Sequence, residues 1–127
     1  MSTRCQIGFY TDMPTRASID KPDALIYRHS DGYPDRQYGV SATIVPLLLE
    51  FTNKRGFWDS EYCAGYVLAH WMTGVTGYGV TQRLHGDIEY YYAVYDKGLQ
   101  VYETSRVFRL SERPSFDDMV LVDTLTW

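Results

Sequence analysis

Cysteines, histidines and recognisable catalytic motifs are scarce in this sequence. It contains two cysteines, Cys5 and Cys63, without CxxC spacing and without a signal-peptide pattern ahead of them. We therefore expect reduced thiols and a cytoplasmic location. The three histidines, His29, His70 and His85, are scattered and join no HExxH motif, so no metal site is expected. Neither a GxGxxG fingerprint nor a P-loop is present, and no cofactor is expected.

Long apolar runs and an excess of basic residues are also missing. The longest apolar stretch lies around residues 45–49, far below the roughly 20 residues that cross a bilayer, so membrane insertion is not expected. The formal net charge is −4 and the pI is about 5.2. This balance gives no general attraction for nucleic-acid phosphates or anionic membranes. Nucleic-acid binding is therefore not expected beyond a local basic patch.

Tyrosine, by contrast, is abundant in a chain of ordinary globular composition. The 127 residues are 45% hydrophobic and 22% charged, which predicts one folded domain over residues 1–127. Twelve are tyrosines, and tyrosine combines a large apolar ring with a polar tip. They predict either packing across a sheet or an exposed contact surface, which could support a homodimer. The densest group is Tyr90, Tyr91, Tyr92, Tyr95 and Tyr102.

The first half of the chain predicts two strands followed by two helices. Alternating apolar residues place the strands at 4–10 and 24–29, joined by a polar loop or flap. The first helix is predicted over 44–55, with Thr43 as N-cap and Pro46 in its first turn. The second helix is predicted over about 60–73, where apolar residues recur at helical spacing.

The second half predicts mainly strands. These cover 78–84, 88–95 and 99–104, with hairpin turns at Gly86-Asp87 and at 96–98. The tail predicts a strand at 107–110, then a short helix capped by Ser115 or a final strand over 120–127. The whole pattern predicts an α+β fold: an antiparallel or mixed sheet of about five strands with two main helices packed on one face.

The most distinctive chemistry lies in the block YRHSDGYP at residues 27–34, where a strand ends in a polar, aromatic loop. Arg28 can grip a phosphate or carboxylate, His29 can act as acid, base or donor, and Tyr33 can stack on a planar ligand. Alternatively, His29 and Asp31 satisfy each other in a well-made turn. The residues predicted to bind a ligand or partner are Arg28, His29, Asp31, Tyr33, Arg36 and Tyr38.

Other candidate groups are weaker. Cys63 and His70 would lie two helical turns apart, about 10 Å, which is too far for a nucleophile and its base. Asp87 and Glu89 predict a carboxylate pair or, more simply, solvated charge. The basic segment 106–113 predicts contact with an anionic partner or a solvated face. None of these groups forms a catalytic constellation.

Four segments together resemble a family of small uncharacterised proteins encoded by phages, prophages and plasmids. They are the opening MSTR, the YRHSDGYP block, the leucine-rich stretch 46–51 and the segment DIEY at 87–90. The resemblance spans roughly residues 1–95 and leaves the tail outside. It implies an accessory protein of a mobile element, acting in the host cytoplasm on restriction, CRISPR or nucleotide-signalling defences or on regulation of the element.

Three functional hypotheses follow. The leading one is a non-enzymatic binding protein, an anti-defence or host-modulating inhibitor that contacts a host defence protein or a nucleotide-type anion through the 28–38 loop and the tyrosine-rich sheet. The alternative is a small enzyme acting on a phosphorylated ligand, with His29 as acid or base, Asp31 orienting it and Arg28 holding the anion. The third is a nucleic-acid binder, which the acidic pI disfavours, or a nucleic-acid mimic, which the diffuse acidic pattern disfavours.

Overall fold

A computed structural model describes residues 3–71 and 77–127 of the chain. A mixed six-stranded sheet in the order β3-β2-β1-β4-β5-β6 organises the fold. Its central strands, β1 and β4, are parallel, and all other neighbours are antiparallel. The α+β prediction is confirmed, with six strands instead of about five. The strands are β1 (Cys5–Phe9), β2 (Ala24–Arg28), β3 (Tyr78–Val80), β4 (Tyr90–Tyr95), β5 (Gly98–Thr104) and β6 (Met119–Thr126).

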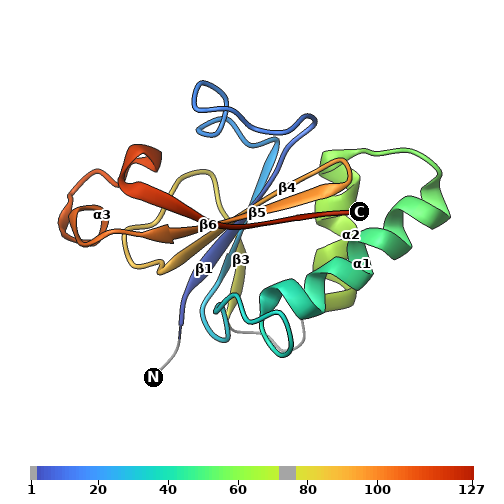
Figure 1. The fold of residues 1–127 in the computed structure, drawn as a ribbon, viewed down its shortest axis with the longest axis horizontal. Coiled ribbons are helices and arrows are strands. Elements are labelled where there is room, and N and C mark those ends of the chain that lie inside the picture. The colour runs from blue at the N-terminus through green and yellow to red at the C-terminus, as the bar shows by residue number, and fades with distance from the viewer. Residues whose placement is uncertain (1–2, 72–76) are drawn as a thin grey trace.

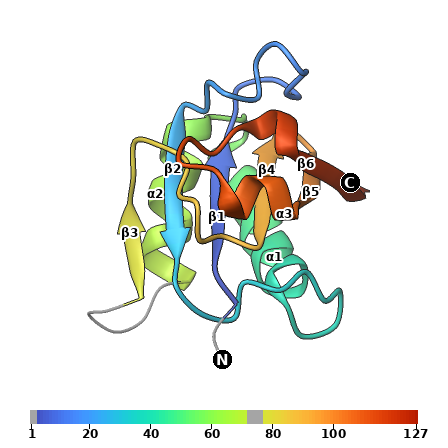
Figure 2. The same cartoon turned by 90° about the vertical axis from the view of Figure 1, so that its left-hand side faces the viewer.

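The two main helices, α1 (Val40–Arg55) and α2 (Ser60–Trp71), cover one face of the sheet (Figure 1). Ile7 and Tyr92 from the central strands pack there against Ile44 and Val67 from the helices. Figure 2 shows a short helix, α3 (Arg106–Leu110), in front of the opposite face. Phe108 of this helix is fully buried and belongs to the second core cluster. Both faces are therefore covered, the second by short elements and connections.

The tyrosines of β4 supply much of both cores. Tyr91 and Tyr92 are fully buried and point to opposite faces. The hydroxyl of Tyr91 shares a hydrogen bond with that of Tyr10, and Tyr92 Oη donates to the Gly32 carbonyl at 2.6 Å. Because Tyr95 is also buried, these three tyrosines of β4 pack within the two cores, whereas Tyr90 and Tyr102 of the predicted group are partly exposed.

Helix α1 begins four residues earlier than the sequence predicts. Its N-cap is Gly39, and Thr43 lies inside the helix, where its hydroxyl donates to the Gly39 and Val40 carbonyls. Pro46 consequently sits in the helix interior and not in the first turn. The predicted C-terminal end is confirmed, since Gly56 adopts the left-handed conformation at φ 84°. The earlier start follows from the loop, whose Tyr33 carbonyl accepts from the Val40 amide.

Two strand predictions in the second half are wrong. The strand predicted over 78–84 ends at Val80, and Gly86-Asp87 makes no hairpin, because β3 pairs with β2 whereas β4 pairs with β1. The segment 107–110 is helical, and Ser105 caps it by accepting from the Phe108 amide. Ser115 caps the 3-10 turn η1 (Phe116–Asp118), and the final strand is confirmed as β6. The predicted end of the second helix near Thr73 lies outside the described residues.

None of the helices in the described part of the chain is both long enough and apolar enough to cross a membrane.

Candidate functional site

The side chain of Arg28, which the sequence predicts to bind an anion, makes contacts inside the protein. It ends β2 on the face that α2 covers, and its guanidinium carbon lies 4.0 Å from the Trp71 ring centroid and 5.5 Å from that of Tyr78. Such cation–π contacts stabilise when the cation is partly desolvated. Its Nε is buried and has no hydrogen-bond partner among the described residues. Arg28 therefore joins the end of α2 to the sheet.

His29 and Asp31 are both exposed. Nδ1 of His29 accepts from Arg4 Nε at 3.4 Å, and Asp31 adopts a left-handed conformation at φ 57°. Across residues 3–71 and 77–127 no hydrogen bond joins the pair. Both the turn interpretation and the acid–base alternative assume a hydrogen bond between His29 and Asp31, and the described residues do not show one.

The rest of the predicted loop is fixed on the sheet edge. Arg36 makes two hydrogen bonds to the carboxylate of Asp123 on β6. Its Nε donates to Oδ2 at 2.9 Å, and its Nη2 donates to Oδ1 at 2.5 Å. Asp35 accepts from the backbone amides of the next turn, and these bonds lower the pKa of its carboxyl group. Tyr33 and Tyr38 stay exposed, at 38% and 72%. Of the six predicted residues, the two arginines thus make internal contacts and the two tyrosines face solvent.

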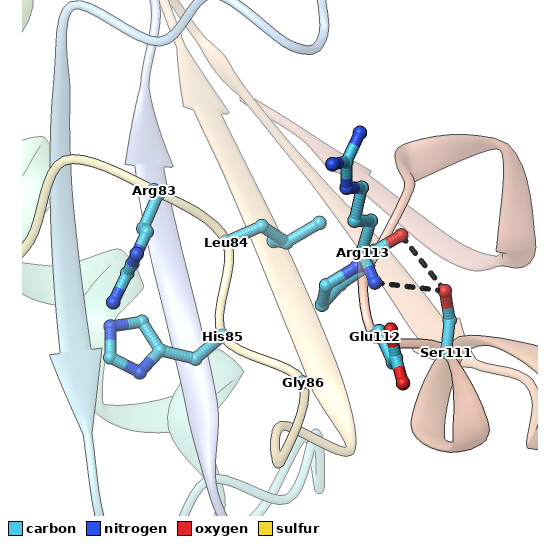
Figure 3. A pocket seen from close by; sticks show the side chains of 8 residues that line it. Arg83, Leu84, His85, Gly86, Ser111, Glu112 and Arg113 are labelled. Carbon is cyan, nitrogen blue, oxygen red and sulfur yellow. Dashed lines mark hydrogen bonds between the residues drawn. The ribbon is translucent and has the colours of Figure 1, made fainter.

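A hollow that the sequence reasoning missed lies between two connections far apart in the chain (Figure 3). One wall is the connection between β3 and β4, and the other is the connection between α3 and η1. Its volume is about 510 Å³, within the range typical of small-molecule sites. It is lined by Arg83, Leu84, His85, Gly86, Ser111, Glu112, Arg113 and Pro114.

The first wall is held by one buried side chain, Gln6 of β1. This residue is 0% exposed. Its Nε2 donates to Thr81 Oγ1 and to the Arg83 carbonyl, each at 3.0 Å, and its Oε1 accepts from the His85 amide at 2.8 Å. A buried amide with its polar atoms bonded stabilises one arrangement of its neighbours. The 81–85 backbone is therefore preformed around Gln6.

The second wall is a compact turn. Ser111 Oγ accepts from the Arg113 amide at 3.1 Å and donates to the Arg113 carbonyl at 3.0 Å, as the dashed lines in Figure 3 mark. The walls approach each other at Gly86 and Pro114, where a Cβ added to the glycine would lie 3.4 Å from the proline ring. The hollow is therefore bounded by two walls with internal hydrogen bonds.

Arginine dominates the charge of the hollow. Arg83 and Arg113 are exposed, and neither forms an ion pair within the described ranges. Figure 3 shows Arg83 beside the His85 ring and Arg113 extending from the facing wall. The one carboxylate among the lining residues is Glu112. Two free guanidinium groups around one hollow favour an anion, because each presents a planar fork to phosphate or carboxylate oxygens.

An aromatic pair extends the first wall. The rings of His85 and Tyr27 lie 4.9 Å apart. Burial, and then the hydrogen bond from Tyr27 Oη to Asp87 at 2.7 Å, raises the pKa of this phenol to about 12. Tyr27 therefore remains a protonated donor at neutral pH and fixes its ring beside His85. The two ring planes are tilted by 41°, and either ring offers an aromatic face on which a planar group can stack.

Reactive nucleophiles and metal ligands do not gather in the described part of the chain. Burial raises the pKa of both thiols, Cys5 and Cys63, to about 12, so neither is ionised at neutral pH. Over residues 3–71 and 77–127, no group of three or more histidine, cysteine, aspartate or glutamate side chains is placed to hold a metal ion.

Comparison with protein-family models, curated proteins and solved structures finds no match to this chain.

Proposed function

We propose that this chain is a non-enzymatic binding protein that holds a small anionic ligand of the nucleotide type in the Arg83–Arg113 hollow. The observation that carries the proposal is the pair of free guanidinium groups on two preformed walls. Phosphate oxygens would bind the arginines, and the Tyr27–His85 edge would receive the planar base. Preformed walls favour binding because little ordering is needed when the ligand enters.

The chemistry around the hollow supports binding over turnover. Catalysis by a nucleophile requires an activated side chain with a base in hydrogen-bond reach. Both thiols are buried, and His85 places its ring against Tyr27. Among the described residues, the hydrogen bonds of His29 and His70 run to Arg4 and to the Tyr66 carbonyl, and neither histidine bonds a carboxylate.

The biological setting of the proposal is that of a mobile-element accessory protein. The resemblance of the YRHSDGYP block to phage and plasmid proteins carries this part. Sequestering a nucleotide-type signal would weaken a host defence that depends on it. The exposed Tyr33 and Tyr38 support a second mode, in which the 28–38 loop contacts a host defence protein directly.

Thermal unfolding with a panel of anions tests the proposal. AMP, ADP, cyclic AMP, ADP-ribose and inorganic pyrophosphate are the probes. A ligand at 100 times its Kd stabilises by about 2.7 kcal/mol and should raise Tm by several degrees. We expect at least one probe to do so, and we expect the double variant Arg83→Gln/Arg113→Gln to lose the shift. Arg109→Gln, an exposed arginine on α3 that does not line the hollow, is the matched control.

A second variant separates charge from shape. Gly86 has no left-handed conformation, so Gly86→Leu fills the space beside Pro114 without backbone strain and should also abolish the shift. No shift with any probe contradicts the proposal. A shift that survives both hollow variants but is lost in His29→Ala/Tyr33→Ala assigns the ligand to the 28–38 loop instead.

A further inference from the structure

A second hollow lies on the same side of the sheet as the Arg83–Arg113 hollow. Both are lined by members of the second core cluster, Leu84 in the first and Ile19 and Phe116 in the second. The second hollow has a volume of about 310 Å³, and we call it the Phe116 hollow. Its apolar lining consists of Pro14, Ile19, Tyr102, Phe116, Met119 and Leu121.

Two walls of the Phe116 hollow are fixed by contacts inside the protein. The Phe116 ring meets the fully buried Tyr91 ring edge to face, with the ring centroids 5.0 Å apart. On the wall formed by the loop 14–19, the Ile19 carbonyl accepts a hydrogen bond from Tyr10 Oη at 2.6 Å. A mostly apolar hollow with an aromatic wall and a few polar groups is typical of a small-molecule site. The Phe116 hollow therefore offers a preformed place for a flat ring.

A middle hollow connects the two. Its volume is about 510 Å³. It shares Arg113 and Pro114 with the Arg83–Arg113 hollow, and it shares Arg16, Ile19, Phe116 and Asp117 with the Phe116 hollow. The three hollows therefore adjoin one another, with Arg113 at the first junction and Arg16 at the second. A ligand held at Arg113 can extend along this surface into the Phe116 hollow.

The charges of the middle hollow suit a neutral, hydrogen-bonding group better than a second anion. Arg16 and Arg113 are balanced there by Asp20 and Asp117. The Arg16–Asp117 pair is long, at 3.8 Å, and its side chains are 88% and 72% exposed, so it contributes little stability. Both groups can therefore turn to a ligand. Carboxylates accept hydrogen bonds from sugar hydroxyls and base amino groups but repel phosphate, so a nucleoside fits here and a bare phosphate does not.

We propose that the ligand of this protein is a dinucleotide, with its phosphodiester at Arg83 and Arg113 and its second nucleoside in the middle and Phe116 hollows. This inference rests on the proposed function and adds the second half of the site. The first base lies on the Tyr27–His85 edge and the second stacks in the Phe116 hollow, so each aromatic end receives one base. A mononucleotide would occupy only one end.

Isothermal titration calorimetry with two probes tests this inference. The dinucleotide ApA and the methyl ester of 3′-AMP carry the same phosphodiester charge, but only ApA has a second nucleoside. We expect the wild-type chain to bind ApA about tenfold tighter or more, because an aromatic ring that stacks on one more base contributes roughly such a factor.

A tryptophan placed in the Phe116 hollow should remove this preference. Leu121 lines the Phe116 hollow and neither of the others. We expect Leu121→Trp to bind ApA no tighter than the methyl ester, with the affinity for the methyl ester as in the wild type. Val120→Trp is the matched control. Val120 is exposed on the same strand and lines none of the three hollows, so this variant should keep the preference.

The outcomes separate this inference from the proposed function. Equal affinity for the two probes in the wild type, or a preference for ApA that survives in Leu121→Trp, overturns the dinucleotide and leaves the anion site standing. Binding of neither probe also overturns the dinucleotide, and the thermal shifts with the anion panel then decide the proposed function by themselves. Where Leu121→Trp fails to fold, Thr15→Trp fills the same hollow from an exposed position on the loop. Met13→Trp, which lies outside the hollow, is the control for that variant.

Discussion

Gln6 is the residue on which the candidate site depends. It is a polar side chain in a strand whose five residues are all buried, and its amide makes three hydrogen bonds to the 81–85 segment. Because that segment carries Arg83 and His85, one buried amide connects the centre of the sheet to the hollow.

Replacing this amide should both destabilise the fold and loosen the hollow. Gln6→Leu keeps the volume but leaves the His85 amide and the Arg83 carbonyl without partners. We expect a loss of roughly 1–3 kcal/mol in the free energy of unfolding, measured by urea denaturation. Faster hydrogen exchange at the His85 amide should accompany it. Gln82→Leu, an exposed glutamine in the same segment, is the control and should change neither. Unchanged exchange at His85 in Gln6→Leu would show that the wall does not need Gln6.

At the scale of elements, helix α1 contains an interior proline that lowers its stability. Pro46 lies exposed in the helix interior, where proline lacks the amide that would bond back four residues and its ring crowds the preceding turn. Pro46→Ala should therefore raise the free energy of unfolding by about 1–3 kcal/mol, measured by urea denaturation. Pro34→Ala, in the loop before the helix, is the comparison and should not stabilise. A Pro46→Ala protein less stable than the wild type would contradict the assignment of an interior proline.

Elements were predictable from sequence where local signals and tertiary partners agree. Gly56 ends α1 as its position predicts, and the turn at 96–98 joins β4 and β5. The turn pattern predicts Gly98 in the left-handed conformation, but Lys97 adopts it, at φ 62°. Prediction failed where a distant residue decides. Alternation over 78–84 predicts a strand. However, the backbone carbonyl of Arg83 and the backbone amide of His85 form hydrogen bonds with the Gln6 side chain. Likewise Thr43 resembles an N-cap, but Tyr33 fixes the helix start earlier.

At the scale of the whole molecule, buried phenols link stability to alkaline pH. Burial raises the pKa of Tyr10, Tyr91 and Tyr92 above the ordinary value of 10. A phenol is neutral when protonated, so a raised folded pKa gives stability that is present below pH 10. It is lost as the pH rises above the unfolded value toward the folded one.

We therefore expect cooperative unfolding in alkali. Tyrosinate absorbance and circular dichroism, followed together above pH 10, should show the exposed tyrosines ionising first and the buried ones only as the fold is lost. Tyr92→Phe removes one such group, so the free energy of unfolding should fall less steeply as the pH rises. Ionisation of all twelve tyrosines in one step near pH 10, with the fold intact, would contradict the burial of this core.

The candidate site was less predictable than the fold, because it joins segments distant in sequence. Arg83 and Arg113 are brought together only when β4 and β5 place the two connections side by side. The segment 106–113 did show local basic character, but nothing near it indicates the facing wall. The 28–38 loop drew attention through its composition, yet Arg28 and Arg36 there bind Trp71 and Asp123.

Whether the hollow or the loop receives the ligand is decided most directly by an amide chemical-shift titration with ADP-ribose and, separately, inorganic pyrophosphate. The account predicts saturable shifts in the amides of 83–86 and 111–114, with those of 29–38 unchanged, and loss of these shifts in Arg83→Gln/Arg113→Gln. Shifts confined to 29–38, or none with either probe, would contradict it.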